Sequence, residues 1–367
     1  MAKDLSIEVN GIKFENPFLL GSGPPGTNAK VIAKSFDLGW GGVVCKTISL
    51  DASLVVNVAP RYGKFKSRKT GEVVGFENIE LISDRPFETW LDELRQLKKE
   101  YPNKVLVASI MEEGKKENWQ EIVRRVEETG VDAFEMNLSC PHGMPERRMG
   151  LAMGEDPTCV AEVVGWVKEV STIPVWAKMT PNVTHPKDSA LAASGAGADG
   201  IAAINTILSV VGIDPKTLKP QPTVAGATVP GGYSGQAVRP IALRHVMEIA
   251  KAIPKDVTIS GMGGIETGWD AAQFMLLGSH TVQVCTGAML NGYAMIEGLC
   301  EELLKFTVDH NFERLADCVG HSLPHFSTHA KLVEAQRQAK LERKSGADNN
   351  WQGDIAKETS DLTATEE

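Results

Sequence analysis

The chain has 367 residues, of which 42% are hydrophobic and 23% charged, and its formal net charge is −9. These proportions are ordinary for a globular protein, and the acidic balance argues against nucleic acid or an anionic membrane as a partner. No apolar run is long enough to span a bilayer, and the length allows one large core such as an α/β barrel.

Six cysteines are spread along the chain and never form a Cys-x-x-Cys pair. We therefore expect no iron–sulfur cluster, no metal site and a reducing compartment. The first residues, MAKDLSIEVNG, have the character of neither a secretory signal nor a transit peptide. This favours the cytoplasm, or the plastid stroma if a transit peptide has been removed.

The chain opens with a predicted β-hairpin, LSIEVNG and IKF, that turns at Asn10-Gly11 and closes one end of the following fold. Short apolar strands then alternate with polar loops and amphipathic helices. Eight strands are predicted, at residues 17–21, 42–46, 105–111, 133–138, 175–179, 200–205, 257–260 and 281–286. Eight helices are predicted, at residues 29–38, 86–99, 118–129, 157–170, 186–194, 240–252, 268–277 and 294–310.

Eight buried strands alternating with helices favour a closed parallel (β/α)8 barrel. The competing fold is an open doubly wound sheet. Residues 21–26, GSGPPG, have the spacing of its dinucleotide turn, but two prolines make them a poor helix entry. We expect the barrel to occupy residues 1–310, a helical extension residues 311–345 and a disordered tail residues 346–367.

Two segments interrupt the repeat. Residues 47–84 read as a hairpin with its turn at 64–71, and residues 206–239 as a Pro/Gly-rich binding loop. Residues 143–154, GMPERRMGLAMG, have glycines at both ends and suit a lid, although an ordinary loop fits them equally well.

Polar groups follow nearly every predicted strand, where barrel active sites lie. In DAFEMNLSCPHG, residues 132–143, an apolar strand ends in Asn137, Ser139, Cys140 and His142. Taken alone, this segment could equally be a strand, a polar turn and an inert cysteine.

The ends of the last two strands, GMGGI and CTG, offer backbone N–H groups at the usual phosphate position of such barrels, although tight turns alone would also explain them. Lys46 and Lys178 end apolar strands and need an anion, which could be a ligand or a structural carboxylate. One of them could instead form a Schiff base, as in barrel aldolases. Two lysines, amides and a phosphate cradle best suit flavin mononucleotide (FMN).

The chain resembles the FMN-barrel domain of dihydropyrimidine dehydrogenases over about residues 4–330, in NLSCPHGMPERRMG, FENIELISDRP, AKMTPNVT, AAINT, PGGYSGQAVRPIALR and ISGMGGIETG. GSGPPGTN, IMEEGKKENW and WQGD are most similar to the short NADP-dependent form of plant plastids. The wider relatives are the dihydroorotate dehydrogenases, which carry a similar Asn-x-Ser-Cys-Pro stretch.

The resemblance implies roles for individual residues. FMN contacts are implied at Ser22, Lys46, Thr47, Lys178, Gly235, Gly263, Gly264, Ile265, Cys285 and Thr286. Pyrimidine contacts are implied at Asn78, Glu80, Asn137, Leu138, Ser139, Asn205 and Thr206. Cys140 stands where the family has its catalytic acid, and a thiol with an ordinary pKa of about 8.5 suits that role.

The implied reaction is reduction of uracil or thymine to the 5,6-dihydropyrimidine with NADPH through FMN, the first step of pyrimidine catabolism. The chain has no convincing second dinucleotide site, so an electron-delivery partner is expected, together with homo-oligomers. The alternatives are dihydroorotate oxidation and, more distantly, a lysine-dependent barrel aldolase.

Overall fold

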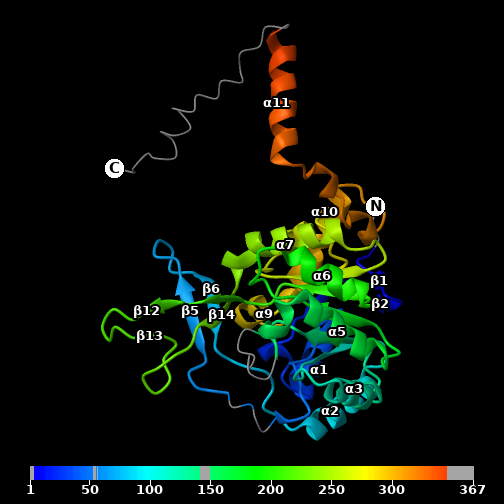
Figure 1. Ribbon diagram of the computed structural model, residues 1–367, viewed down its shortest axis with the longest axis vertical. Coiled ribbons are helices and arrows are strands. Elements are labelled where there is room, and N and C mark those ends of the chain that lie inside the picture. The colour runs from blue at the N-terminus through cyan, green and yellow to red at the C-terminus, as the bar shows by residue number, and fades with distance from the viewer. Residues whose placement is uncertain (1–3, 53–54, 56, 141–148, 345–367) are drawn as a thin grey trace. The chain divides into compact units, whose positions relative to one another are not determined.

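The structure is a computed structural model that describes residues 4–52, 55, 57–140 and 149–344 (Figure 1). Residues 1–323 form one compact unit, and a second unit begins at Pro324. No helix within the described ranges is long and apolar enough to cross a membrane.

Eight parallel strands close into a barrel, as the sequence predicts, and the open doubly wound sheet is excluded. The strands are β3 (Phe18–Leu20), β4 (Gly42–Val44), β7 (Val105–Ile110), β8 (Ala133–Asn137), β9 (Val175–Lys178), β10 (Gly200–Ala203), β15 (Thr258–Met262) and β16 (Thr281–Val284). Each begins within one residue of its predicted start. Around the barrel their order is β10-β15-β16-β3-β4-β7-β8-β9.

Eight helices connect or follow these strands: α1 (Ala29–Asp37), α2 (Phe87–Glu100), α3 (Lys116–Glu127), α5 (Pro157–Lys168), α6 (Pro186–Gly195), α7 (Arg239–Ala252), α8 (Gly268–Leu276) and α10 (Met295–Asp309). Their starts follow local chemistry, since Asn28 caps α1 and Thr267 forms a capping box with Asp270 on α8. Two short helices, α4 (Leu151–Gly154) and α9 (Thr286–Asn291), lack a periodic apolar pattern and were not predicted.

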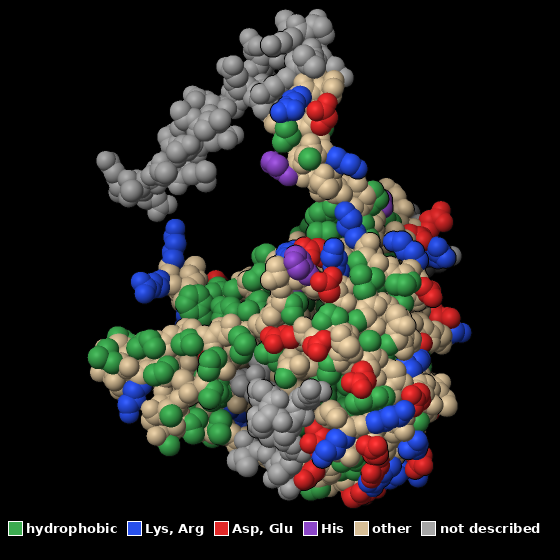
Figure 2. All heavy atoms as spheres, viewed as in Figure 1, with side chains coloured by type: hydrophobic (Ala, Val, Ile, Leu, Met, Phe, Trp, Pro, Cys, Tyr) green, Lys and Arg blue, Asp and Glu red, His purple; other side chains and the backbone are tan. Residues whose placement is uncertain are grey.

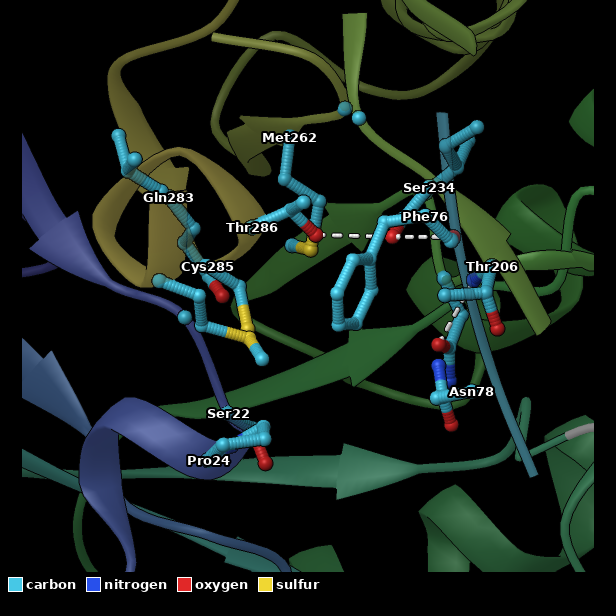
Figure 3. A pocket seen from close by; sticks show the side chains of 18 of the residues that line it. Ser22, Pro24, Phe76, Asn78, Thr206, Ser234, Met262, Gln283, Cys285 and Thr286 are labelled. Carbon is cyan, nitrogen blue, oxygen red and sulfur yellow. Dashed lines mark hydrogen bonds between the residues drawn. The ribbon is translucent and has the colours of Figure 1, made fainter. Parts of the chain in front are cut away.

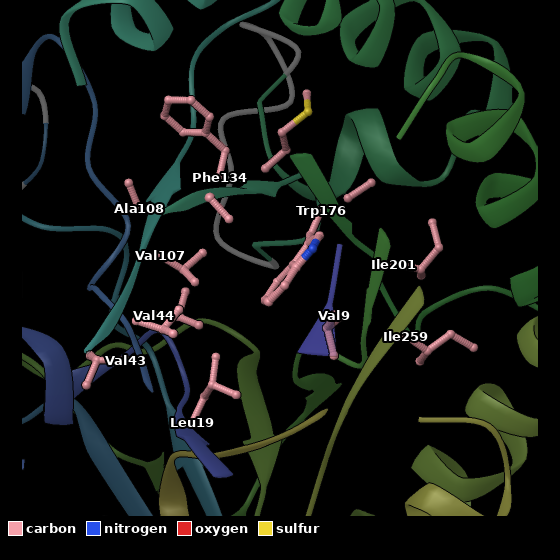
Figure 4. Close-up of a cluster of buried hydrophobic side chains, with 14 of the residues drawn as sticks. Val9, Leu19, Val43, Val44, Val107, Ala108, Phe134, Trp176, Ile201 and Ile259 are labelled. Carbon is pink, nitrogen blue, oxygen red and sulfur yellow. The ribbon is translucent and has the colours of Figure 1, made fainter. Parts of the chain in front are cut away.

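The N-terminal hairpin, β1 (Ile7–Val9) and β2 (Ile12–Phe14), covers the amino end of the barrel. Asn10 at its turn accepts hydrogen bonds from Trp176 Nε1 at 2.9 Å and Thr258 Oγ1 at 2.7 Å. Figure 4 shows Trp176 between the strands with Val9 beside it. The hairpin therefore closes this end, as predicted, and leaves the carboxyl end for a ligand.

The insertions after β4 and β10 pair into one antiparallel sheet of order β11-β14-β6-β5. Its strands are β5 (Tyr62–Lys66), β6 (Val73–Asn78), β11 (Ile207–Ser209) and β14 (Gly231–Ser234), with a small hairpin of β12 (Gly212–Ile213) and β13 (Pro220–Gln221) between β11 and β14. The predicted turn at residues 64–71 starts too early, because Lys64–Lys66 still pair with β6. The segment 206–239, expected as a loop, supplies two of the four strands.

Two expectations fall partly on residues that the structure does not describe. Of the predicted lid at 143–154, residues 143–148 lie outside the described residues and Leu151–Gly154 form α4. The expected tail at 346–367 also lies outside them. The helix expected before it is α11 (His329–Lys344), and the division at residues 310 and 345 stays a prediction.

Candidate active site

A cavity lies at the carboxyl ends of the barrel strands and opens to solvent, with about 1050 Å³ of empty space when the solvent at its mouth is included. The barrel loops form its floor, and the inserted sheet contributes Tyr62, Phe76, Asn78, Tyr233 and Ser234. Figure 3 shows Ser22, Cys285 and Thr286 from the barrel across from Asn78 and Thr206, with the Phe76 ring between them. The inserted sheet therefore completes a chamber that the barrel alone leaves open.

All the predicted site residues line this cavity except Leu138 and Ser139. Those that line it are Ser22, Lys46, Thr47, Asn78, Glu80, Asn137, Cys140, Lys178, Asn205, Thr206, Gly235, Gly263, Gly264, Ile265, Cys285 and Thr286. Leu138 and Ser139 are fully buried and do not line the cavity. The individual roles of these residues stay predictions, but one chamber brings them together.

Four polar side chains form a fixed cluster at the end of β8. Ser139 Oγ donates to Asn137 Oδ1 at 3.1 Å, and Asn205 Nδ2 donates to Ser139 Oγ at 2.9 Å. Asn137 Nδ2 donates to Thr47 Oγ1 at 3.0 Å. Ser139 thus contacts both asparagine amides on their buried side, and its expected contact with the pyrimidine stays a prediction.

Lys46 and Glu80 form a buried ion pair, with 3.0 Å between Nζ and Oε1. The same carboxylate accepts from Arg61 Nη1 at 3.1 Å and from the Tyr62 hydroxyl at 2.9 Å. Burial and Glu80 together raise the pKa of Tyr62 above its usual range. Glu80 is therefore the counter-ion of two cations in this structure, although the resemblance assigns it to the substrate.

Lys178 has its own buried partner, because its Nζ lies 3.0 Å from Glu135 Oε1. Glu135 is fully buried and also accepts from Gln283 Nε2 at 2.7 Å. Each lysine therefore pairs with a carboxylate of the protein, which was one of the two kinds of anion expected from the sequence. Both lysines also line the cavity. An ammonium group has three donors, so a salt bridge leaves room for a ligand contact.

Cys140 lines the cavity, is 6% exposed, and lies in an apolar cluster with Val55, Ile82, Met111 and Met149. The second thiol of the cavity is Cys285, and desolvation raises its pKa to about 11. Cys285 therefore stays protonated at neutral pH and is a poor nucleophile.

Three glycines with positive φ line one side of the cavity: Gly235 (φ +90), Gly263 (φ +133) and Gly264 (φ +73). A Cβ at Gly264 would lie 2.7 Å from the Gly235 carbonyl oxygen, so only glycine fits there. Beside them, the hydroxyls of Ser234 and Thr286 are hydrogen-bonded at 2.8 Å. Bare backbone and hydroxyls are the groups that bind phosphate, so this region fits the phosphate of a mononucleotide.

Several lining residues escaped prediction from the sequence, among them Tyr62, Phe76, Tyr233, Met262 and Gln283. Tyr62 and Phe76 lie in the predicted hairpin, whose place at the cavity no local pattern indicates, and Tyr233 lies in a segment expected as a loop. Gln283 could have been predicted from the sequence. Thr281 and Gln283 alternate with valines in a buried strand, so both face the barrel interior.

A family model described as dihydroorotate dehydrogenase matches residues 4–307. The chain is 54% identical to "Dihydropyrimidine dehydrogenase (NADP(+)), chloroplastic" of Arabidopsis thaliana, over 98% of this chain and 88% of the relative. It is 45% identical to "NAD-dependent dihydropyrimidine dehydrogenase subunit PreA" of Escherichia coli K12, over 87% and 77% of the two chains. It is 34% identical to "Dihydroorotate dehydrogenase B (NAD(+)), catalytic subunit" of Pyrococcus abyssi, over 87% and 99%.

Among solved structures, the chain is similar to the DHODH of Eimeria tenella in complex with ferulenol. The TM-score is 0.72 at 21% identity, over 87% of this chain and 88% of the other. This similarity supports the barrel fold alone.

Proposed function

The chain belongs to the dihydroorotate dehydrogenase family, and we propose that it reduces the 5,6 double bond of uracil or thymine with electrons from NADPH. The observation that carries the proposal is a single chamber that Cys140 lines together with the asparagine pair Asn137 and Asn205. The names of the relatives at 54% and 45% identity agree with this reaction.

A pyrimidine ring offers N–H donors and carbonyl acceptors around a rigid plane, and amide side chains can match both. Asn78, Asn137, Asn205 and Thr206 line the cavity with such groups. Because Ser139 and Thr47 hold the Asn137 amide on both sides, its orientation is set before a substrate arrives. Pre-ordered amides of this kind favour a planar substrate of fixed hydrogen-bond pattern.

The residues of the cavity also fit FMN. We assign the phosphate to Gly263, Gly264 and Thr286, and the ring to the side of Lys46 and Lys178. The fit rests on the bare backbone of the left-handed glycines and on two buried cations that line the same cavity. When bound, the flavin supplies a hydride to C6 of the pyrimidine.

Cys140 completes the reaction by donating its thiol proton to C5, so that the ring gains one hydride and one proton. Its apolar neighbours exclude water from the thiol, so that the proton passes to the substrate. Asn137 and Asn205 hold the ring so that C5 faces the sulfur. Lys46 and Lys178 place positive charge where the reduced cofactor is negative.

Anaerobic spectroscopy tests the proposal. We expect the purified protein to bind one FMN, to bleach when NADPH and its electron-delivery partner are added, and to recover its flavin absorbance with uracil. Recovery with orotate instead, which is the reverse of dihydroorotate oxidation, would favour the alternative supported by the 34% identical relative. A colourless protein that forms a borohydride-trapped adduct at a lysine would favour the aldolase.

We propose that a separate protein passes electrons from NADPH to the flavin. The E. coli relative is named as a subunit, which supports this arrangement. Adding NADPH to the purified chain alone tests it. Rapid bleaching without any other protein contradicts the need for a partner.

We also propose that the protein forms homo-oligomers through the projecting part of the inserted sheet. Figure 2 shows hydrophobic side chains gathered over this region, which carries Phe65, Leu208, Val210, Ile213, Leu218 and Val229, each at least 41% exposed. A group of exposed apolar side chains on neighbouring strands and loops is typical of an interface.

Introducing charge into this patch tests its role. We expect Leu218→Glu combined with Val210→Glu to lower the native mass, measured by light scattering, because buried glutamates would be unpaired in an interface. Leu191→Glu on α6 is the matched control, since Leu191 is 42% exposed and lies outside the patch. An unchanged mass in the double variant contradicts the proposed interface.

The compartment is the remaining proposal. The name of the Arabidopsis relative, chloroplastic, favours the plastid stroma over the cytoplasm expected from composition. Imaging of a fluorescent fusion expressed from the complete coding sequence distinguishes the two.

A further inference from the structure

A line of polar side chains crosses the interior of the barrel below the cavity. Glu135 on β8 accepts from Lys178 Nζ of β9 at 3.0 Å and from Gln283 Nε2 of β16 at 2.7 Å. In the strand order, β8 and β16 lie on opposite sides of the barrel, so the Gln283–Glu135 bond spans its diameter. Gln283 Nε2 also donates to Ser260 Oγ at 3.2 Å. These residues replace one of the apolar layers that usually fill such a barrel.

This arrangement is costly for stability. Glu135 is fully buried, Lys178 is 4% exposed and Gln283 is 2% exposed. Removing a carboxylate and an ammonium group from water costs several kcal/mol per ion, and well-packed apolar residues often stabilise as much as such a pair. The network is therefore better explained by what it does at the cavity floor than by stability.

The network fixes more than the position of Lys178. A carboxylate can only accept, so the Gln283 amide must turn its nitrogen toward Glu135. Its oxygen Oε1 is then left buried with no hydrogen-bond partner within the described part of the chain. Gln283 lines the cavity, and Oε1 lies 3.4 Å from the place where a Cβ on Gly21 would stand. An acceptor is thus held ready at the edge of the ligand chamber.

We propose that Glu135, braced by Gln283, is a positioning residue that sets the redox preference of the bound flavin through Lys178. The inference rests on the proposed function, because it requires a flavin in the cavity. Glu135 holds the Lys178 ammonium at the cavity floor and offsets part of its charge. The site then stabilises the reduced cofactor without binding it so tightly that hydride transfer to the pyrimidine is disfavoured.

The sign of the effect follows from the charges around the cavity. Lys46 is paired with Glu80, which Arg61 shares, and Lys178 is paired with Glu135, so a carboxylate offsets part of the charge of each ammonium group. Removing the charge of Glu135 leaves Lys178 uncompensated. The reduced cofactor, which carries the additional negative charge, is then bound more tightly relative to the oxidised one, and its midpoint potential rises.

Redox titration of the FMN-loaded protein against a reference dye tests the inference. In Glu135→Gln we expect the ratio of affinities for reduced and oxidised flavin to increase about tenfold, or about 30 mV for a two-electron couple. Glu135→Asp keeps the charge but shortens the side chain, so that it cannot reach Lys178 and Gln283 together. For Glu135→Asp we expect the midpoint potential to rise by a smaller amount. If Glu135→Gln does not fold, this variant tests the inference in its place.

Asp199→Asn is the matched control. Asp199 Oδ2 lies 2.7 Å from Lys168 Nζ, but Asp199 precedes β10 at the amino end of the barrel, away from the cavity. We expect the midpoint potential of the flavin in Asp199→Asn to equal that of the wild type. An unchanged potential in both Glu135 variants overturns the inference, as does a full Glu135→Gln shift in a Lys178→Met background. If the wild type binds no flavin, the proposed function itself fails, which is a different result.

Discussion

Replacing Cys140 with alanine is expected to lower uracil turnover by roughly 10²- to 10⁴-fold, the usual contribution of a positioned acid. The thiol lines the cavity in apolar surroundings, and the variant removes the proposed proton donor for C5. Flavin binding and bleaching by reduced partner should be unchanged, because Cys140 is not among the residues assigned to the cofactor. The rate of flavin reoxidation by uracil, measured anaerobically in a single turnover, isolates this step.

Cys300→Ala controls for the loss of a thiol as such. Cys300 lies on α10, and burial raises its pKa to about 11, so it should be chemically inert. Cys140→Ser should remain far below the wild type, because a hydroxyl is a much weaker acid than a thiol. If Cys140→Ala reoxidises its flavin with uracil at a near wild-type rate, the proton comes from another group.

The barrel could be predicted because its strands are short, continuous apolar runs with β-branched residues. Residues 105–110, VLVASI, are an example: they are buried throughout, as expected for a parallel strand covered on both faces. Knowing the fold then places the ends of these strands at one mouth. This explains why Asn137, Cys140 and Lys178 could be assigned to one chamber from the sequence.

The hairpin of β5 and β6 was predicted, but its union with β11 and β14 into one sheet was not, because those strands are short and pair over long distances. β14 reads GGYS, and two glycines in four residues indicate a loop. Its pairing with β6 joins Gly232 to Asn78, more than 150 residues away, and local patterns carry no information about such contacts. Tyr62, Phe76 and Tyr233 reach the cavity only through this pairing.

The ion-pair partners of the two buried lysines could not be predicted from the sequence either. Two anions for two lysines were anticipated, but nothing local indicates that Glu80 pairs with Lys46 and Glu135 with Lys178. Glu135 lies two residues before Asn137 on the same strand face, which is compatible with either a core or a site position. Only the geometry shows that its carboxylate bonds across the barrel to Gln283.

Replacing Gly154 with alanine is expected to impair both stability and activity, although Gly154 does not line the cavity. A Cβ at this position would lie 2.0 Å from the backbone oxygen of Leu138, in the segment between Asn137 and Cys140. On the other side, Ser189 Oγ donates to the Gly154 carbonyl oxygen at 2.9 Å, so α4 cannot simply move away. We expect a loss of about 1–3 kcal/mol in the free energy of unfolding, typical of overpacking.

The activity should fall further than this loss of stability explains. The added methyl group pushes the Leu138 carbonyl, and Leu151 N–H is bonded to the Cys140 carbonyl at 3.0 Å, so the strand end and α4 shift together. A displacement of about 1 Å in catalytic groups can cost about 10²-fold in rate. Gly165→Ala in α5 is the matched control, because no atom lies within 4 Å of its added Cβ. Thermal unfolding and steady-state turnover of the two variants separate the effects, and equal turnover in both would show that the β8 end tolerates displacement.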